Sequence, residues 1–194
     1  MSLSSDSDSL PMWQYYGLFG YALKLNISNL FRSAFVSGLQ VDTERMNNTS
    51  IGKVIYDEEK QISLLKQKLD KIYKSGLKSI KEVNHLINDL CIQFEIQKLF
   101  YKNNAYNNEK EYRCLFSISS DDSIKANKYR LSKNGMIVPY IVVQFTNLDD
   151  IIEEIKIHPL MDEQLSKDGL VALFKTKKMK SIPITKSEIP FREL

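Results

Sequence analysis

The chain shows two kinds of apolar pattern, a helical one in its middle and an alternating one on both sides. In the middle, four apolar residues recur at intervals of three, four and three, as one face of an α-helix requires. These residues are Ile62, Leu65, Leu69 and Ile72. Asp57 can cap the start of this helix, and Gly76 can end it in the left-handed conformation. The pattern therefore predicts an amphipathic helix that begins at Glu58.

A second helix is predicted after a short break. Ser79 and Glu82 form an S-x-x-E capping box, in which each side chain bonds the backbone N–H of the other residue. The apolar residues that follow again share one helical face, and they are Val83, Ile87, Leu90 and Phe94. Together the two helices predict a helical hairpin over residues 57–101, and we expect both apolar stripes to be buried against a sheet.

On both sides of the hairpin, apolar and polar residues alternate with a period of two, which is typical of strands. Asn134 and Gly135 predict a tight turn, and Pro139 indicates an edge strand or a bulge. A helical pattern between the last two strands predicts a parallel, right-handed crossover. The predicted strands are residues 21–26, 53–56, 112–119, 128–132, 136–145, 154–158 and 181–185, and the predicted flanking helices are residues 11–16 and 162–177.

These elements predict an α+β fold in a single domain over residues 1–194. We expect a mixed sheet of about five to seven strands packed against the hairpin, with the strand–helix–strand unit at the C-terminal end. The Ser/Asp-rich run near the N-terminus predicts a flexible end over residues 1–8, or a cluster of N-caps for the helix behind it.

Composition narrows the class of protein. With 43% apolar and 26% charged residues, the chain has the make-up of a soluble globular protein, and a net charge of +3 is too small to argue for nucleic acid. No apolar run approaches the roughly 18 residues that span a bilayer, so we expect no membrane contact and a cytoplasmic location. The spacing of Cys91 and Cys114 matches no disulfide or metal motif, which predicts buried free thiols, with a disulfide between them as the alternative.

The candidate chemistry is concentrated in residues 101–113, between the predicted hairpin and the next strand. Glu109 and Glu111 lie two residues apart, so on a strand they share one face. A carboxylate pair can divide the acid and base roles of a catalytic site, which makes both residues catalytic candidates. The alternative is that they pair with cations and lock the junction of helix and strand. Either way, we predict a contact from one of them to Arg113, Arg130 or Arg192.

A second group of residues is predicted to bind a ligand. Trp13 and Tyr16 can stack on a flat ligand, and Gly17 lets the backbone approach it closely. The alternative is a core tryptophan with a hydrogen-bonded indole. Arg192 can clamp an anion through two hydrogen bonds or pair with a carboxylate. The complete ligand-binding set is Trp13, Tyr16, Gly17, Arg113, Tyr140 and Arg192.

No metal site is predicted, because the two histidines, His85 and His158, and the two cysteines lack the spacing of a zinc site. A basic run follows the last predicted helix and consists of Lys175, Lys177, Lys178 and Lys180. Cations suit the end of a helix, so this run is interpreted as a solvated helix terminus, with a nucleic-acid patch as the alternative.

Five blocks of the sequence, in order, resemble a bacterial family, domain-of-unknown-function family 2971. They are residues 9–17 (SLPMWQYYG), 20–25 (GYALKL), 106–113 (YNNEKEYR), 138–140 (VPY) and 187–192 (SEIPFR). Members of that family usually begin with a further region carrying His-Tyr-Thr-like and Asn-Asp-Pro-x-Glu stretches, which this sequence lacks. The resemblance therefore predicts a catalytically silent chain that associates with a second copy to cover an exposed edge.

Function is predicted only as a class. The resemblance implies an uncharacterised bacterial intracellular module that binds a ligand or acts as an effector, with a small molecule or a second copy as partner and no known cofactor. The alternative is an ADP-ribosyltransferase, whose order of motifs is similar. In that case Glu111 would hold the ribose hydroxyl of NAD and polarise the departing nicotinamide.

Overall fold

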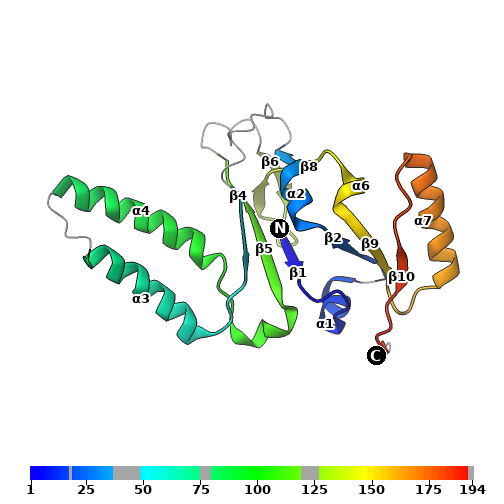
Figure 1. Ribbon diagram of the computed structural model, residues 1–194, viewed down its shortest axis with the longest axis horizontal. Helices are drawn as coiled ribbons and strands as arrows, with labels where there is room; N and C mark the ends of the chain where they lie inside the picture. The colour runs from blue at the N-terminus through cyan, green and yellow to red at the C-terminus, as the bar shows by residue number, and fades with distance from the viewer. Residues whose placement is uncertain (18, 37–48, 75–79, 119–126, 192–194) are drawn as a thin grey trace. The chain divides into compact units, whose positions relative to one another are not determined.

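The protein is seen in a computed structural model that describes residues 1–17, 19–36, 49–74, 80–118 and 127–191 (Figure 1). It is an α+β protein that divides into two compact units. Unit 1 comprises Met1–Asp6 and Ser50–Leu115, and unit 2 comprises Ser7–Thr49 and Phe116–Leu194. Each unit is built on a three-stranded sheet of its own.

The sheet of unit 1 has the order β1-β5-β4 and is formed by β1 (Ser2–Ser4), β5 (Glu111–Phe116) and β4 (Thr49–Lys53). β1 runs antiparallel to β5, with Ser2 opposite Arg113 and Ser4 opposite Glu111. The N-terminal ammonium adds a 2.8 Å hydrogen bond to the carbonyl of Cys114. A flexible end is predicted for residues 1–8, whereas in the structure residues 2–4 find backbone partners along β5 and form a strand.

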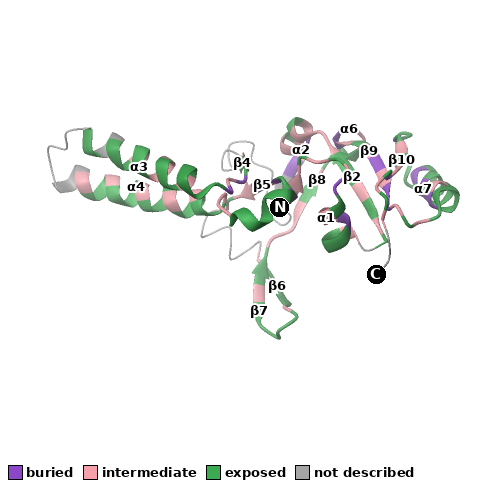
Figure 2. Ribbon diagram, turned by 90° about the horizontal axis from the view of Figure 1, so that it is seen from below, coloured by how far each residue is buried: buried purple, intermediate pink, exposed green. Residues whose placement is uncertain are grey.

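Two long helices, α3 (Glu58–Lys74) and α4 (Ile80–Lys98), lie where the sequence predicts the hairpin and run side by side in Figures 1 and 2. The predicted N-cap is confirmed, because Asp57 Oδ1 accepts a 2.7 Å hydrogen bond from the backbone N–H of Lys60. Gly76 and Ser79, the predicted end and capping box, fall outside the described residues.

The apolar stripes of these helices are not buried as predicted. None of the side chains described in either helix is buried, and Ile62 and Leu69 are 43% and 48% exposed. Half-buried apolar positions on α4 recur at intervals of three, four and four, namely Val83, Leu86, Leu90 and Phe94. Such a row suits a narrow seam between two helices, which leaves their outer faces in water. Cys91 lies on an outer face and is exposed, contrary to prediction, whereas Cys114 is buried as predicted.

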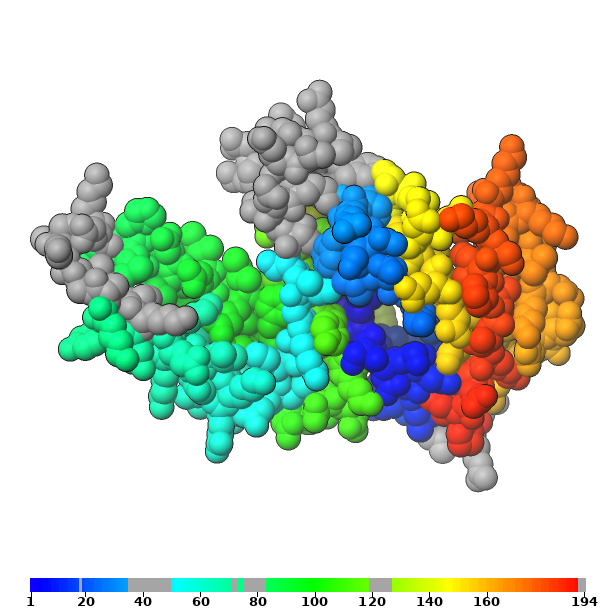
Figure 3. All heavy atoms as spheres, viewed as in Figure 1, coloured from blue at the N-terminus to red at the C-terminus, as the bar shows by residue number. Residues whose placement is uncertain are grey.

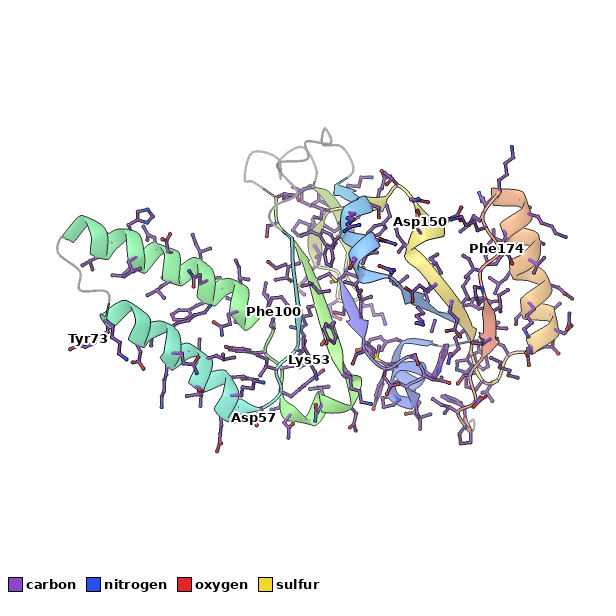
Figure 4. All side chains as sticks on the ribbon, in the orientation of Figure 1. Lys53, Asp57, Tyr73, Phe100, Asp150 and Phe174 are labelled. Atoms are coloured by element: carbon purple, nitrogen blue, oxygen red, sulfur yellow. The ribbon has the colours of Figure 1, made fainter. Side chains whose placement is uncertain are left out.

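The sheet of unit 2 has the order β10-β9-β2 and is formed by β10 (Ile184–Lys186), β9 (Ile152–Ile157) and β2 (Tyr21–Leu25). β10 is parallel to β9, as predicted, and β2 is antiparallel to it. The connecting helix α7 (Glu163–Lys177) begins at Asp162, whose carboxylate accepts a 2.7 Å hydrogen bond from Leu165 N–H. Its apolar face packs on the sheet and forms a core of Ile155, Leu170, Phe174 and Ile182. Figures 3 and 4 show α7 beside β10.

Shorter elements complete unit 2: α1 (Leu10–Met12), a π-helical turn (Trp13–Gly17), α2 (Ile27–Ser33), β3 (Ala34–Val36), β6 (Lys128–Leu131), β7 (Ile137–Tyr140), β8 (Val143–Phe145) and α6 (Leu148–Ile151). The long strand predicted over residues 136–145 is divided into β7 and β8. β7 pairs with β6, and β8 pairs with β3. The described strands thus form sheets of three, three, two and two strands, and one large mixed sheet is not confirmed.

Candidate functional site

The predicted carboxylate pair lies at the start of β5, in unit 1. A single 3-10 helix, Asn104–Glu109, precedes the strand and begins at Asn103, whose side chain accepts from Ala105 N–H at 2.9 Å. Lys110 then takes a left-handed conformation, with φ of 47°, and turns the chain into β5. This turn leaves Glu109 at the end of the helix and Glu111 at the start of the strand, and both are buried.

Two cations hold the carboxylates in a continuous ion-pair cluster. Arg113 donates to Glu111 through Nε at 2.8 Å and through Nη2 at 3.1 Å, a two-pronged contact with both carboxylate oxygens. Lys102 Nζ donates to Glu109 at 2.6 Å and to Glu111 at 3.2 Å. The predicted contact between a glutamate and an arginine is therefore confirmed, with Arg113 as the partner.

The pKa of Glu111 lies well below its ordinary range. Burial alone would raise it, but hydrogen bonds from Arg113, Ser2 and Lys102, together with the charge of Arg113, lower the pKa to about 2. Burial alone would lower the pKa of Lys102, but its hydrogen bonds to Glu109 and Glu111 raise that pKa above the ordinary value. Glu111 is therefore ionised at neutral pH, whereas a general acid or base works best with a pKa near the operating pH.

Further contacts attach the cluster to several parts of unit 1. Arg113 Nη1 donates to the carbonyl of Leu99, just after α4, and the backbone N–H of Glu111 donates to the Tyr56 hydroxyl at 2.9 Å. On the other side, Ser4 of β1 donates to the carbonyl of Glu109 at 2.8 Å. The cluster thus joins the edge strand, the central strand and the end of α4, which matches the alternative prediction of a locked junction.

In unit 2, the half-buried carboxylate of Asp8 binds the predicted tryptophan. Asp8 Oδ1 accepts from the Trp13 indole N–H at 2.8 Å and from the Ser187 hydroxyl at 2.7 Å. Its Oδ2 accepts from Glu188 N–H at 3.3 Å and lies 3.5 Å from Lys156 Nζ. Burial opposes these contacts, but the hydrogen bonds and the charge of Lys156 leave the pKa of Asp8 below its ordinary value. The interpretation of Trp13 as a core residue with a bonded indole fits this geometry.

His158 stands among aromatic rings beside Asp8 and Trp13. Its ring centroid is 5.1 Å from that of Trp13, 5.4 Å from Phe19 and 5.0 Å from Phe191. Its Nδ1 accepts from Leu160 N–H at 3.2 Å, and burial lowers its pKa below the ordinary value. The neutral imidazole is therefore favoured, as part of an aromatic cluster that consists of Trp13, Phe19, His158 and Phe191.

Gly17 lies against this cluster for a steric reason. A Cβ atom on Gly17 would stand 2.5 Å from Trp13 Cε3, closer than real side chains approach each other. Glycine is thus needed for the indole to lie against the π-helical turn. The predicted role of Gly17, a close approach of the backbone, is met by the protein's own tryptophan.

The other predicted ligand-binding residues are distributed over the chain. Tyr16 is exposed, next to the ring of Tyr15, and Tyr140 is partly exposed at the end of β7. Arg113 belongs to unit 1 with Glu111, whereas Trp13 belongs to unit 2, and Arg192 is outside the described residues. The sequence pattern does not single out Asp8, His158 and Ser187 as members of one site. The Ser/Asp run and the Ser-x-Ile-Pro block contain two of them, but nothing local signals that they meet.

The described residues contain no group of three or more His, Cys, Asp or Glu side chains that could hold a metal ion. Within the same part of the chain, none of the helices is both long and apolar enough to cross a membrane.

These observations define an α+β protein whose characteristic acidic block serves as an internal ion-pair junction. The chain belongs to the family described as Protein of unknown function (DUF2971), whose model matches residues 12–114. That range contains the Gly-Tyr-Ala block, the Glu-x-Glu-x-Arg block and most of the Trp13 block, so the resemblance is confirmed. The two later blocks lie beyond the matched residues. Comparisons with curated proteins and with solved structures gave no match.

Proposed function

We propose that this protein is a bacterial cytoplasmic module that binds a ligand or partner and acts through contact rather than through covalent chemistry. The observation that carries the proposal is the state of Glu111. Both of its oxygens accept hydrogen bonds from Arg113 or Lys102, and its side chain stays ionised at neutral pH. A carboxylate that is held in these ion pairs stabilises the fold of unit 1, and its low pKa does not suit proton exchange with a substrate.

The ADP-ribosyltransferase alternative has no support. It requires Glu111 to accept a hydrogen bond from a ribose hydroxyl, yet Arg113 contacts both carboxylate oxygens, and Lys102 and Ser2 also donate to this carboxylate, so its acceptor positions are taken. Freeing an oxygen would break a buried ion pair, a change that costs roughly 3–5 kcal/mol in comparable cases. Neither the family match nor the geometry supplies a reason for NAD to bind here.

For the ligand, we propose a flat molecule that stacks next to the π-helical turn. Tyr15, Tyr16 and Phe19 are exposed large aromatic residues within one short stretch. Behind them, the buried Trp13 and His158 fix the backbone, so the exposed rings stand on a rigid support. Rings of this kind gain free energy by stacking on a heteroaromatic base, which makes nucleotides the first class to test.

A thermal-shift screen of nucleotides, NAD included, tests this proposal. A ligand that binds only the native state at 100 times its Kd stabilises it by about 2.7 kcal/mol, which is readily measured. We expect a positive shift that Tyr16→Ala abolishes and that Glu111→Gln leaves in place. The control is Tyr73→Ala, which removes an exposed tyrosine from α3 in the other unit.

The results of the screen separate the competing proposals. A shift that depends on Glu111 and is accompanied by turnover of NAD would contradict the proposal and support an enzyme. The proposed stacking site would be contradicted if no nucleotide raised the thermal midpoint. It would also be contradicted if Tyr16→Ala and Tyr73→Ala reduced the thermal shift equally.

We also propose that the chain pairs with a second copy of itself through α3. In the stripe of Ile62, Leu65 and Leu69, the described part of the chain leaves Ile62 and Leu69 exposed and buries Leu65 only in part. α3 has acidic residues in its first turn, Glu58 and Glu59, and ends in a lysine-rich half. An antiparallel pair of α3 helices would bring stripe onto stripe and place each acidic start near a basic end.

A further inference from the structure

The segment of residues 128–140 differs in charge from the rest of the chain. It contains three cations, Lys128, Arg130 and Lys133, and no acidic residue. The chain as a whole has a net charge of +3, so outside this segment acidic and basic residues are equal in number. None of the three cations forms an ion pair with a carboxylate in the described part of the chain. The segment is therefore a cationic patch whose charges are not paired by any carboxylate of the described residues.

The segment folds into a two-stranded ribbon. β6 and β7 pair antiparallel, with Tyr129 opposite Pro139 and Leu131 opposite Ile137. The turn between them is closed by a 2.8 Å hydrogen bond from Ser132 N–H to the Met136 carbonyl, and Gly135 adopts a φ of 77° that favours glycine. In Figure 2 the ribbon extends away from β8, and most of it is coloured as exposed.

The pairing sorts the side chains by chemistry. Opposed residues of an antiparallel pair share a face, so one face carries Tyr129, Leu131, Ile137 and Pro139. The other face carries Lys128 and Arg130 with Val138 and Tyr140. The ribbon is thus apolar on one side and cationic with an aromatic ring on the other.

The apolar side chains of the ribbon are unusually exposed. Tyr129, Leu131, Met136 and Ile137 have 67%, 69%, 61% and 72% of their surfaces in water. Single exposed apolar residues are ordinary, but a contiguous group marks an interaction site. Two strands cannot bury this group between themselves, because every member lies on one face or in the turn.

We propose that the β6–β7 ribbon docks on a lipid surface with anionic headgroups. Both halves of the pattern suit this partner. Unpaired cations near the anionic surface gain about 1 kcal/mol each, and aliphatic side chains reach the boundary of the acyl chains. Tyrosine is enriched at the level of the headgroups because its ring is apolar and its hydroxyl polar. A nucleic acid would satisfy the cations but would leave Leu131, Met136 and Ile137 in water.

The order of residues along the ribbon suits insertion of its turn into the lipid surface. A strand rises about 3.4 Å per residue, and interfacial elements insert roughly 5–10 Å, which is two or three residues. Leu131, Met136 and Ile137 lie within that depth of the turn, and Arg130 and Tyr129 follow at the level of the headgroups. Lys133, in the turn, can extend its aliphatic stem and return its ammonium to the phosphates. This contact is peripheral and departs from the expectation of no membrane partner.

Co-sedimentation of the full chain with vesicles tests the proposal. We expect binding to phosphatidylcholine vesicles that contain phosphatidylglycerol, little binding to pure phosphatidylcholine, and a fall in binding as salt is added. The triple substitution Lys128→Gln, Arg130→Gln, Lys133→Gln should reduce the partition coefficient about 100-fold. The double substitution Leu131→Ser, Ile137→Ser should reduce it at least about tenfold, because the apolar contribution is lost.

Helix α7 offers matched controls for both changes. Lys175→Gln, Lys177→Gln, Lys178→Gln removes the same charge from another exposed surface, and Leu165→Ser, Leu173→Ser removes two exposed leucines. Neither control should change vesicle binding. All these positions are exposed, so circular dichroism and the thermal midpoint should remain those of the wild type.

Several results would overturn the proposal. These are no binding to anionic vesicles, equal binding to neutral vesicles, or equal losses in the ribbon and α7 variants. Binding of short single-stranded or duplex oligonucleotides that is lost with the ribbon cations, without vesicle binding, would identify a nucleic-acid ribbon instead.

Discussion

At the scale of the residue, the side chains on which the family resemblance rests also hold the fold together. Glu111 and Arg113 look like catalytic chemistry in the sequence, but in the structure they neutralise each other at a junction of strand and helix. Trp13 and Gly17 are matched to one another, because the indole occupies the space that a side chain on Gly17 would need. A characteristic block of polar and aromatic residues can therefore arise from packing alone.

The first prediction concerns the acid stability that Glu111 provides. Its folded-state pKa of about 2 is below the ordinary 4.5, so between these pH values the unfolded chain binds more protons. The contribution of Glu111 to the free energy of unfolding should be fully present above pH 4.5 and should fall as the pH drops toward 2. With about 1.4 kcal/mol per pKa unit, Glu111→Gln should cost about 3 kcal/mol at neutral pH and flatten this acid limb.

Urea unfolding at a series of pH values measures this effect. Glu59→Gln removes the same charge at an exposed position in the first turn of α3 and should cost less than about 1 kcal/mol. Equal stabilities of the Glu111 variant and the wild type would show that the ion-pair cluster does not stabilise unit 1.

At the scale of the element, the sequences of α3 and α4 favour a helix, but other elements cover little of the surface of either helix. α7 makes the contrast clear, because its inner face packs on β9 and β10 and buries Leu170 and Phe174. On α4 the corresponding positions are only half-buried, and Ile87 and Ile92 are exposed. A helical period shows which residues share a face, but it does not say how much of that face another element covers.

The second prediction compares two faces of α4. Phe94→Ala removes a half-buried ring from the row that suits the seam with α3 and should cost about 1–2 kcal/mol, less than a fully buried ring. Ile92→Ala acts on an exposed face and should change the free energy of unfolding by less than about 0.5 kcal/mol, since alanine also favours the helix. Thermal unfolding followed by circular dichroism measures both, and a larger cost at Ile92 would mean that the outer face is covered.

At the scale of the whole molecule, two compact units each have their own sheet, and their chain segments alternate. Residues 1–6 join unit 1 across more than a hundred residues of sequence, through β1 and β5. The polar cluster lies in unit 1, and the aromatic cluster around His158 lies in unit 2. Each unit also carries one of the proposed interaction surfaces: the α3 stripe belongs to unit 1, and the β6–β7 ribbon belongs to unit 2.

The third prediction is that the protein associates through the α3 stripe. Light scattering at several concentrations should give a mass that rises toward twice 22.5 kDa. Ile62→Glu, Leu69→Glu should restore the mass of one chain, because two buried charges would face each other. Leu165→Glu, Leu173→Glu on α7 is the matched control and should leave the mass unchanged. A single-chain mass for the wild type at every concentration would contradict the prediction.

Elements with local signals can be identified from the amino-acid sequence alone. Period and capping identify α3 and α7, alternation identifies β2 and β9, and Asn134–Gly135 identifies the turn of the ribbon, because each signal depends on residues within a few positions. The sequence also predicts that Glu109 or Glu111 contacts an arginine, with Arg113 as one of three candidates. The pairing of β1 with β5 and of β3 with β8, the contact of Asp8 with Ser187 and the extent to which α3 is covered appear only in the folded chain. Those facts depend on segments far apart in the chain, whose meeting leaves no periodic trace in the sequence.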